Sequence, residues 1–330
     1  MSQENSFNRR RLLQALAAST LPLSGVAPSL AQAAWPDRPI KFIVPFGAGS
    51  GTDIVARLVG QKLSEAVGQP VVVENKVGAS GSIAAEFMTR AAPDGYTVFI
   101  ATQTTQASNA GMFKKLPYDP LKSFEPVTML GSIPLLIVVT PSLPVTNVQE
   151  LMAYARANPG KLTVGYGTGG AQVTAELFKT LAKAEVLLVP YKSNPLALTA
   201  VMAGEINMMV TDPGPSLQLI AAGKLRALAV TTPQRSSIAP NLPTAIEAGL
   251  PGYDLSAWYC ALLPAGTPKP IVTRLHDELA RIVAMPDVKQ RFGQAGIEAF
   301  SSTPEQLQKF MESELVKWST HIKNAGMIPE

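Results

Sequence analysis

Short apolar runs and loops rich in Gly, Ser and Thr alternate along most of this chain. The first run, 41–46, is followed by a loop at 47–53 and then by apolar residues at helical spacing over 54–67. The same succession returns at 71–74, where an apolar run precedes a loop at 75–82 and a second helical pattern. Strands that alternate with helices form parallel sheets covered on both faces. The pattern therefore predicts an α/β fold whose sheets are mostly parallel and flanked by helices.

Further strands and helices are expected along the rest of the chain. The strands are expected at 96–101, 132–141, 162–167, 186–191, 206–210 and 225–231. The helices are expected at 83–92, 147–157, 195–203, 215–222, 271–285 and from 304 onward. A chain of 330 residues is long enough for two domains of ordinary size.

Composition excludes several classes of protein. With 46% hydrophobic and 16% charged residues, the chain can bury sizeable cores, which argues against disorder. Its single cysteine, Cys260, excludes an internal disulfide and every cysteine-based zinc or iron–sulfur site. The formal net charge is +4, and no run of Lys and Arg occurs outside the N-terminal segment. Nucleic acid is therefore not an expected partner.

The first 33 residues have the pattern of an export signal. Basic residues within 8–13 open an apolar stretch that runs to about Leu30, and the small-x-small sequence of 31–33 is typical of a cleavage site. The segment resembles a twin-arginine leader, and a general secretory signal is the alternative. Proline and glycine interrupt the apolar stretch, which disfavours an uncleaved membrane anchor. We expect cleavage near Ala33 and a soluble product outside the cytoplasm.

Three loops, at 47–53, 75–82 and 168–172, each lead from a predicted strand into a predicted helix. The carboxyl ends of parallel strands meet at one edge of a sheet, where ligands bind in such folds. Unpaired backbone N–H groups and the positive end of the helix dipole favour an anion there. Ordinary turns use the same Gly, Ser and Thr residues, so each loop alone is ambiguous. Asp53 lies in a first helical turn and is interpreted as mainly structural.

Enzymatic interpretations find little support in the sequence. The glycines of 47–51 lack the spacing of a dinucleotide-binding turn, and the chain has no P-loop motif. Ser80 lacks the second glycine of a nucleophile elbow. The two histidines, His276 and His321, fall in helical patterns and are interpreted as solvated residues. We therefore predict no catalytic residue, no metal and no cofactor.

Several longer motifs resemble those of the Bug-type solute receptors of tripartite tricarboxylate transporters. The likeness covers nearly all of the chain after the leader. The motifs that carry it are VPFGAGSGTD at 44–53, VENKVGASG at 73–81, APDGYT at 92–97, LPYDP at 116–120, VPYK at 189–192 and GKLRALAVT at 223–231. Together they are specific, whereas each alone would be weak.

The resemblance implies a two-domain periplasmic binding protein, similar to the type II class, that closes on an organic anion. Domain one would comprise 34–139 and 257–330, domain two would comprise 140–256, and crossing strands would form the hinge between them. The ligand would be a small organic carboxylate, delivered to the permease subunits of the inner membrane. We expect a monomer.

The resemblance also implies where the ligand binds. Backbone amides and hydroxyls of the strand-to-helix loops would hold its carboxylate, and Phe46 would form a wall of the cleft. The expected ligand-binding residues are Phe46, Gly47, Ala48, Gly49, Ser50, Thr52, Asp53, Ala79, Ser80, Thr102, Gln103, Thr105, Thr168, Gly169, Gln172 and Asp212. The first-domain loops would bind one carboxylate, and Thr168, Gln172 and Asp212 would contact the rest of the molecule.

Departures from the family pattern concentrate in the second domain. Gln172 stands where the family usually has a histidine, and the segment 193–195 differs from the usual glycine-containing turn. The ligand therefore stays open among a dicarboxylate, an aromatic acid and an amino acid. A ligand-sensing subunit for a membrane kinase and, with less support, an exported hydrolase or oxidoreductase are the alternative functions.

Overall fold

The computed structural model describes residues 35–324 and 326–329. The expected export signal, 1–33, lies outside these residues. All helices and strands described below belong to one unit, Arg38–Glu330. No helix in the described part of the chain is both long enough and apolar enough for a membrane span.

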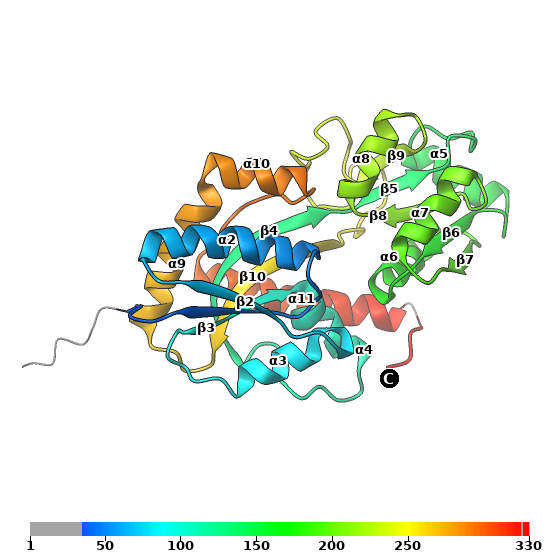
Figure 1. The fold of residues 1–330 in the computed structure, drawn as a ribbon. Coiled ribbons are helices and arrows are strands. Elements are labelled where there is room, and N and C mark those ends of the chain that lie inside the picture. The colour runs from blue at the N-terminus through cyan, green and yellow to red at the C-terminus, as the bar shows by residue number, and fades with distance from the viewer. Residues whose placement is uncertain (1–34, 325, 330) are drawn as a thin grey trace, which may run out of the picture. The chain divides into compact units, whose positions relative to one another are not determined.

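The first five-stranded sheet has the order β2-β1-β3-β10-β4 (Figure 1). Its strands are β1 (Ile40–Val44), β2 (Val71–Asn75), β3 (Thr97–Thr102), β4 (Phe124–Pro134) and β10 (Ser256–Pro264). The strands β1, β2 and β3 run parallel, as the alternating pattern predicts, while β10 pairs antiparallel with both β3 and β4. The parallel part places the carboxyl ends of three strands at one edge.

The second five-stranded sheet has the order β7-β6-β8-β5-β9. Its strands are β5 (Leu136–Val139), β6 (Thr163–Tyr166), β7 (Leu187–Pro190), β8 (Met208–Thr211) and β9 (Arg226–Val230). Here β6, β7 and β8 are parallel, and β5 lies antiparallel between β8 and β9. The apolar run 132–141 is thus divided between the two sheets.

The helices cover both sheets and connect their strands. They are α2 (Gly51–Val67), α3 (Ser82–Thr89), α4 (Asn109–Met112), α5 (Val148–Ala157), α6 (Gly169–Ala182), α7 (Asn194–Ala203), α8 (Pro213–Ala221), α9 (Lys269–Ala284), α10 (Pro286–Gln294) and α11 (Pro304–Asn324), with the short turns η1 (Ala79–Gly81) and η2 (Thr104–Ser108). Local sequence sets both ends of α2. Ser50 caps its start by accepting a hydrogen bond from the Asp53 N–H, and Gly68 ends it with a left-handed φ of 70°.

The chain passes between the two sheets at two adjacent places. Only Leu135 separates β4 from β5, so these strands form a nearly continuous crossing (Figure 1). The return segment after β9 runs beside it, because the Thr231 N–H donates to the Leu135 carbonyl and the Leu255 N–H donates to the Thr231 carbonyl. Two crossing segments joined by hydrogen bonds are the expected location of a hinge.

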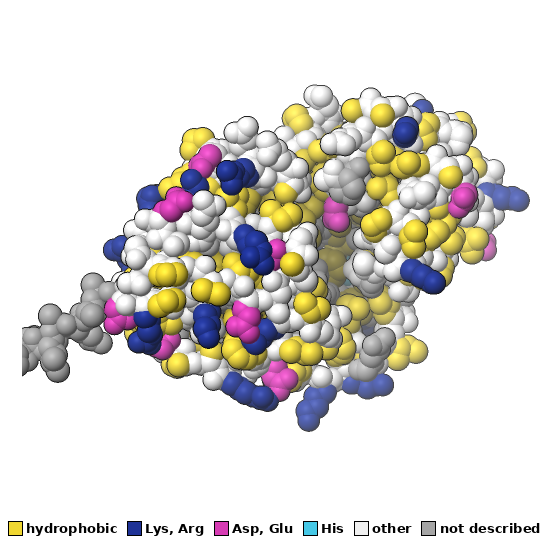
Figure 2. All heavy atoms as spheres, in the orientation of Figure 1, with side chains coloured by type: hydrophobic (Ala, Val, Ile, Leu, Met, Phe, Trp, Pro, Cys, Tyr) yellow, Lys and Arg dark blue, Asp and Glu magenta, His cyan; other side chains and the backbone are white. Residues whose placement is uncertain are grey.

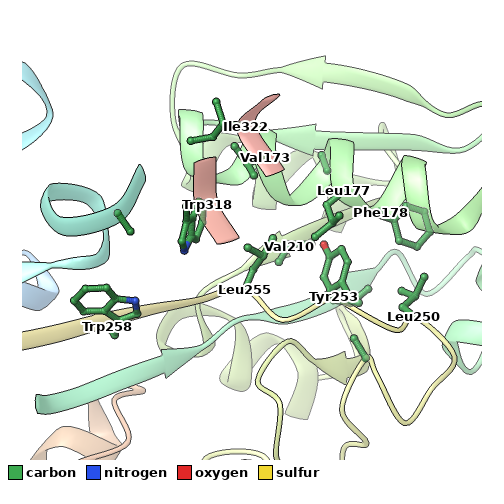
Figure 3. Close-up of a cluster of buried hydrophobic side chains, with 14 of the residues drawn as sticks. Val173, Leu177, Phe178, Val210, Leu250, Tyr253, Leu255, Trp258, Trp318 and Ile322 are labelled. Atoms are coloured by element: carbon green, nitrogen blue, oxygen red, sulfur yellow. The ribbon is translucent and has the colours of Figure 1, made fainter. Parts of the chain in front are cut away.

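A hydrophobic cluster joins elements that are far apart in the sequence. Trp318 and Ile322 of α11 and Trp258 of β10 belong to the same buried cluster as Val173 of α6 (Figure 3). Tyr253, in the return segment, is fully buried, and its hydroxyl donates to the Thr174 carbonyl at 2.9 Å. The C-terminal helix thus contributes both to the core and to the surroundings of the cavity described next.

Candidate functional site

A cavity of about 380 Å³ lies between the ends of the two sheets, lined by residues from both. Figure 2 shows the surface hollowed between the part that carries α2 and the part that carries α7 and α8. The cavity volume falls within the range of small-molecule sites, about 300–1,000 Å³. Its lining includes Phe46, Ser80, Gln103, Thr168, Asp212 and Trp318.

Five of the residues expected from the sequence line this cavity, namely Phe46, Ser80, Gln103, Thr168 and Asp212. They come from five strand-to-helix connections of the two sheets. This arrangement explains how positions up to 166 residues apart in the sequence reach one space. The other expected residues lie close to these along the chain or in the neighbouring loop: Gly47, Ala48, Gly49, Ser50, Thr52, Asp53, Ala79, Thr102, Thr105, Gly169 and Gln172. Their contact with ligand stays a prediction.

The side chain of Asp53 is engaged within its own loop. Its carboxylate accepts hydrogen bonds from the Gly49 N–H, from Arg57 Nε and from Asn75 Nδ2, each at 2.9 Å. Asn75 Nδ2 also donates to the Phe46 carbonyl at 2.8 Å. Burial alone would raise the pKa of Asp53, but these three hydrogen bonds together outweigh it and hold the pKa below its usual range. These contacts support the structural interpretation of Asp53 as the group that holds the loop beside Phe46.

Replacing this carboxylate by an amide is expected to destabilise the protein in a pH-dependent way. Asp53→Asn should lower the free energy of unfolding by about 2 kcal/mol at pH 7, because hydrogen bonds to a charged acceptor are lost. The folded pKa is depressed, so the stabilisation is present above about pH 4 and disappears as pH falls through the folded pKa. Urea titrations of wild type and Asp53→Asn at pH 7 and pH 3 measure the difference in free energy of unfolding. Glu205→Gln, at an exposed carboxylate, is the control. An equal difference at both pH values would contradict this account.

The turn that carries Ser80 has an unusual backbone. Ala79 and Ser80 have φ of 44° and 51°, a left-handed conformation that costs about 1 kcal/mol per non-glycine residue. A Cβ at Gly81 would lie 2.8 Å from Thr105 Cγ2 and 2.9 Å from Pro45 Cβ, so this position requires glycine. The fully buried Asn109 donates to the Ser80 carbonyl at 3.0 Å and holds the turn. Backbone strain of this kind is found at functional sites.

Gln103 brings an unused hydrogen-bond donor to the cavity. The residue is 7% exposed, and its Nε2 has no hydrogen-bond partner among the described residues. A buried donor without a partner is costly unless a ligand or water completes it. Gln103 lies between β3 and η2, beside Thr104, which also lines the cavity. Its buried amide is therefore a donor at the edge of the cavity that the described protein leaves unused.

The second sheet contributes a helix N-terminus. Thr168 follows β6 and caps α6 by accepting from the Ala171 N–H at 3.2 Å. The preceding Gly167 N–H donates to Asn194 Oδ1 at 3.0 Å, which brings the start of α7 next to the start of α6. Gly170, Ala171 and Asn194 line the cavity with Thr168. The positive end of the α6 dipole thus faces the space where an anion would bind.

Asp212 provides a carboxylate to the same wall. It is the N-cap residue of α8, yet its side chain makes no capping hydrogen bond. Burial raises the pKa of Asp212, and burial together with the Asp212 charge raises the pKa of the Tyr259 hydroxyl. Asp212 is therefore a partly buried acid whose side chain does not cap the helix that it precedes.

Trp318 was expected only as a packing residue of the C-terminal helix, but it also lines the cavity. Its indole donates to Glu314 Oε2 at 3.2 Å, and the Trp258 indole donates to the same oxygen at 2.8 Å. Glu314 is 2% exposed and also forms an ion pair with Lys317. Lys317 reaches Asp254 of the return segment at 3.1 Å. This network connects the cavity wall to the segment that crosses between the sheets.

The described lining of the cavity holds one acidic side chain, Asp212. That described lining includes no histidine, and within the described residues no group of three His, Cys, Asp or Glu side chains is placed to hold a metal. The interpretation of the histidines as solvated is wrong, because both are partly buried. His276, which lies in α9, places its Nε2 3.1 Å from the Ser302 carbonyl oxygen. What the cavity offers is hydrogen bonding and an apolar wall.

The family model described as tripartite tricarboxylate transporter family receptor matches residues 55–327. The chain belongs to this family. Protein BugT of Bordetella pertussis is 31% identical to the receptor over 323 residues, which cover 97% of this chain and 99% of BugT. The Bug-type resemblance in the sequence is therefore confirmed.

Two solved structures show the same fold as the receptor. Rpa4515 of R. palustris, solved with adipate, has a TM-score of 0.75 and 36% identity, covering 90% of this chain and 100% of that one. MatC of Rhodopseudomonas palustris, solved with bound malate, has a TM-score of 0.70 and 31% identity, covering 87% and 99%. The predicted α/β fold of a two-domain binding protein is thus confirmed.

Proposed function

We propose that the receptor captures a small organic carboxylate in the cavity between its two sheets and delivers it to the permease subunits of a tripartite transporter. The observation that carries this proposal is the chemistry of the cavity, where hydroxyls, amides and a helix N-terminus converge from both sheets. The solved relatives with adipate and malate support a carboxylate as the ligand. Neutral donors arranged in this way favour a carboxylate without a cationic side chain.

The ligand would be held from both sides. The Ser80 hydroxyl and the Gln103 amide would donate from the first sheet, with Phe46 and Trp318 as apolar walls. The start of α6 would donate from the second sheet.

We place one domain around each sheet, and the chain would pass from the first domain to the second at Leu135. The strand β5 then belongs to the second domain, and the expected boundary after residue 139 moves by a few residues. Closure about the crossing segments would then complete the site.

Transport rather than turnover follows from the same site. The described lining offers Ser80 as a nucleophile but no histidine as its base, so we expect no hydrolysis.

We also propose that the 1–33 segment directs export and is cleaved near Ala33. The mature receptor would then be a monomer in the periplasm. No observation favours a sensor for a membrane kinase over a transport receptor, since both need the same cleft.

Thermal unfolding of refolded receptor with a panel of small carboxylates tests this proposal, because refolding removes a co-purified ligand. A carboxylate at 100 times its Kd should add about 2.7 kcal/mol to the free energy of unfolding. Its Kd should change only modestly between low and physiological salt, because neutral donors hold it. Stabilisation by sugars, phosphates or cations but by no carboxylate would refute the substrate class. A Kd that rises steeply with salt would refute the neutral site.

A further inference from the structure

The charges on the cavity wall are unbalanced. Among the described residues that line it, Asp212 is the only one with a charged side chain, and no Lys, Arg or His is present. Cationic side chains are what usually balance a second carboxylate in a ligand with two. The cavity therefore offers neutral donors for one carboxylate and one acidic group for something else.

Asp212 also has no partner within the described protein. Its carboxylate receives no side-chain or backbone hydrogen bond, although the start of α8 is directly beside it. The contact that Ser216 makes is to the Asp212 backbone carbonyl, at 2.8 Å. Asp212 is partly buried, so its carboxylate gains a hydrogen bond in a partly desolvated space when a ligand supplies a donor.

The donors on the opposite side suit the carboxylate end of a ligand. Gln103 is 7% exposed with an unpartnered Nε2, and Ser80 lines the cavity beside it. Both follow strands of the first sheet, whereas Asp212 follows β8 of the second. A ligand that spans the cavity would therefore meet donors from the first sheet at one wall, and at the other wall both the start of α6 and the acceptor Asp212.

We propose that the ligand carries a hydrogen-bond donor, a hydroxyl or an ammonium group, where it contacts Asp212, and that Asp212 selects such acids over plain mono- and dicarboxylates. This inference rests on the proposed function. A second carboxylate at Asp212 would bring two negative charges together in a partly desolvated space and would be rejected. A donor would instead form a charge-assisted hydrogen bond.

Isothermal titration with matched acids tests the selection. The six-carbon set is hexanoate, adipate, and the 2- and 6-hydroxy and 2- and 6-amino derivatives of hexanoate, and the four-carbon set is built in the same way on butanoate and succinate. In at least one set, a hydroxy or amino acid should bind at least about tenfold tighter than both the plain acid and the dicarboxylate. Asp212→Asn should reduce this preference to within about threefold.

Controls separate selection from folding and from failure of the proposed function. Asp212→Ser keeps a residue suited to a helix N-cap and should lose the preference in the same way. Asp277→Asn, on the exposed side of α9, should keep it. A plain acid or dicarboxylate that binds as tightly as every donor-bearing acid overturns the inference, as does a preference that survives in Asp212→Asn. If no carboxylate of these sets or of the thermal panel binds, the proposed function itself fails.

Discussion

Gly167→Ala is expected to weaken ligand binding about 100-fold, through loss of two or three hydrogen bonds at the cavity. A Cβ on this glycine would overlap the backbone of Ser193 and Asn194. Backbone cannot rotate away as a side chain can, so the start of α7 must move from the start of α6. The 3.0 Å hydrogen bond from the Gly167 N–H to Asn194 Oδ1 would break in the process. Thr168 and Asn194, which both line the cavity, would be displaced together.

The same substitution is expected to lower the free energy of unfolding by about 3 kcal/mol, at the upper end of what overpacking costs. Chemical denaturation measures this loss, and titration with the stabilising carboxylate measures the loss of affinity. Gly293→Ala in α10 is the matched control, because a Cβ there would meet only Ile238 Cδ1, at 3.9 Å. Wild-type stability together with wild-type affinity in Gly167→Ala would show that the close approach of these two loops is unimportant.

Replacement of Glu314 is expected to cause the second large loss of stability. Its carboxylate is the common acceptor of the Trp258 and Trp318 indoles, at 2.8 Å and 3.2 Å, and both indoles are at most 3% exposed. Glu314→Ala would leave two buried N–H groups without an acceptor and would remove the ion-pair partner of Lys317. We expect a loss of about 3 kcal/mol in the free energy of unfolding. Glu314→Gln keeps an acceptor and should lose about 1 kcal/mol.

Glu314 should also affect ligand binding through Trp318, since this indole lines the cavity. Near-ultraviolet circular dichroism of the tryptophans reports whether the indoles keep their fixed surroundings, and titration reports the change in Kd. Glu312→Ala is the matched control on the same helix, where the carboxylate is exposed and accepts a hydrogen bond from Gln308. A Glu314→Ala variant with an unchanged tryptophan spectrum and wild-type stability would contradict the proposed network.

The sequence predicted most of the strands and helices, but it missed β10, α10 and the first part of β4, and it did not predict the division of one apolar run between the sheets. The alternation of strands and helices predicts the α/β class, because each helix that connects two parallel strands covers a face of their sheet. The run 132–141 has no polar break, yet Leu135 separates β4 of the first sheet from β5 of the second. Which strands pair depends on contacts between distant segments, and local hydrophobicity does not contain that information.

The candidate site was predictable where it follows strand ends. Phe46, Ser80, Thr168 and Asp212 could be placed at the cavity by this rule together with the family motifs. Trp318 could not, because a tryptophan on the apolar face of a helix has the same pattern whether it packs in a core or lines a cavity. Several polar residues were likewise missed because their partners are distant in sequence: Asn109, which holds Ser80, Asn194, which holds Gly167, and Glu314.

The most direct test of neutral carboxylate recognition between the two sheets is a crystal structure of refolded receptor with the carboxylate that stabilises it most. We expect the ligand in the cavity lined by Phe46 and Trp318, with its carboxylate held by hydroxyl, amide and backbone N–H donors that include Ser80 and Gln103. A ligand bound elsewhere, or one held mainly by lysine or arginine side chains, would contradict the account.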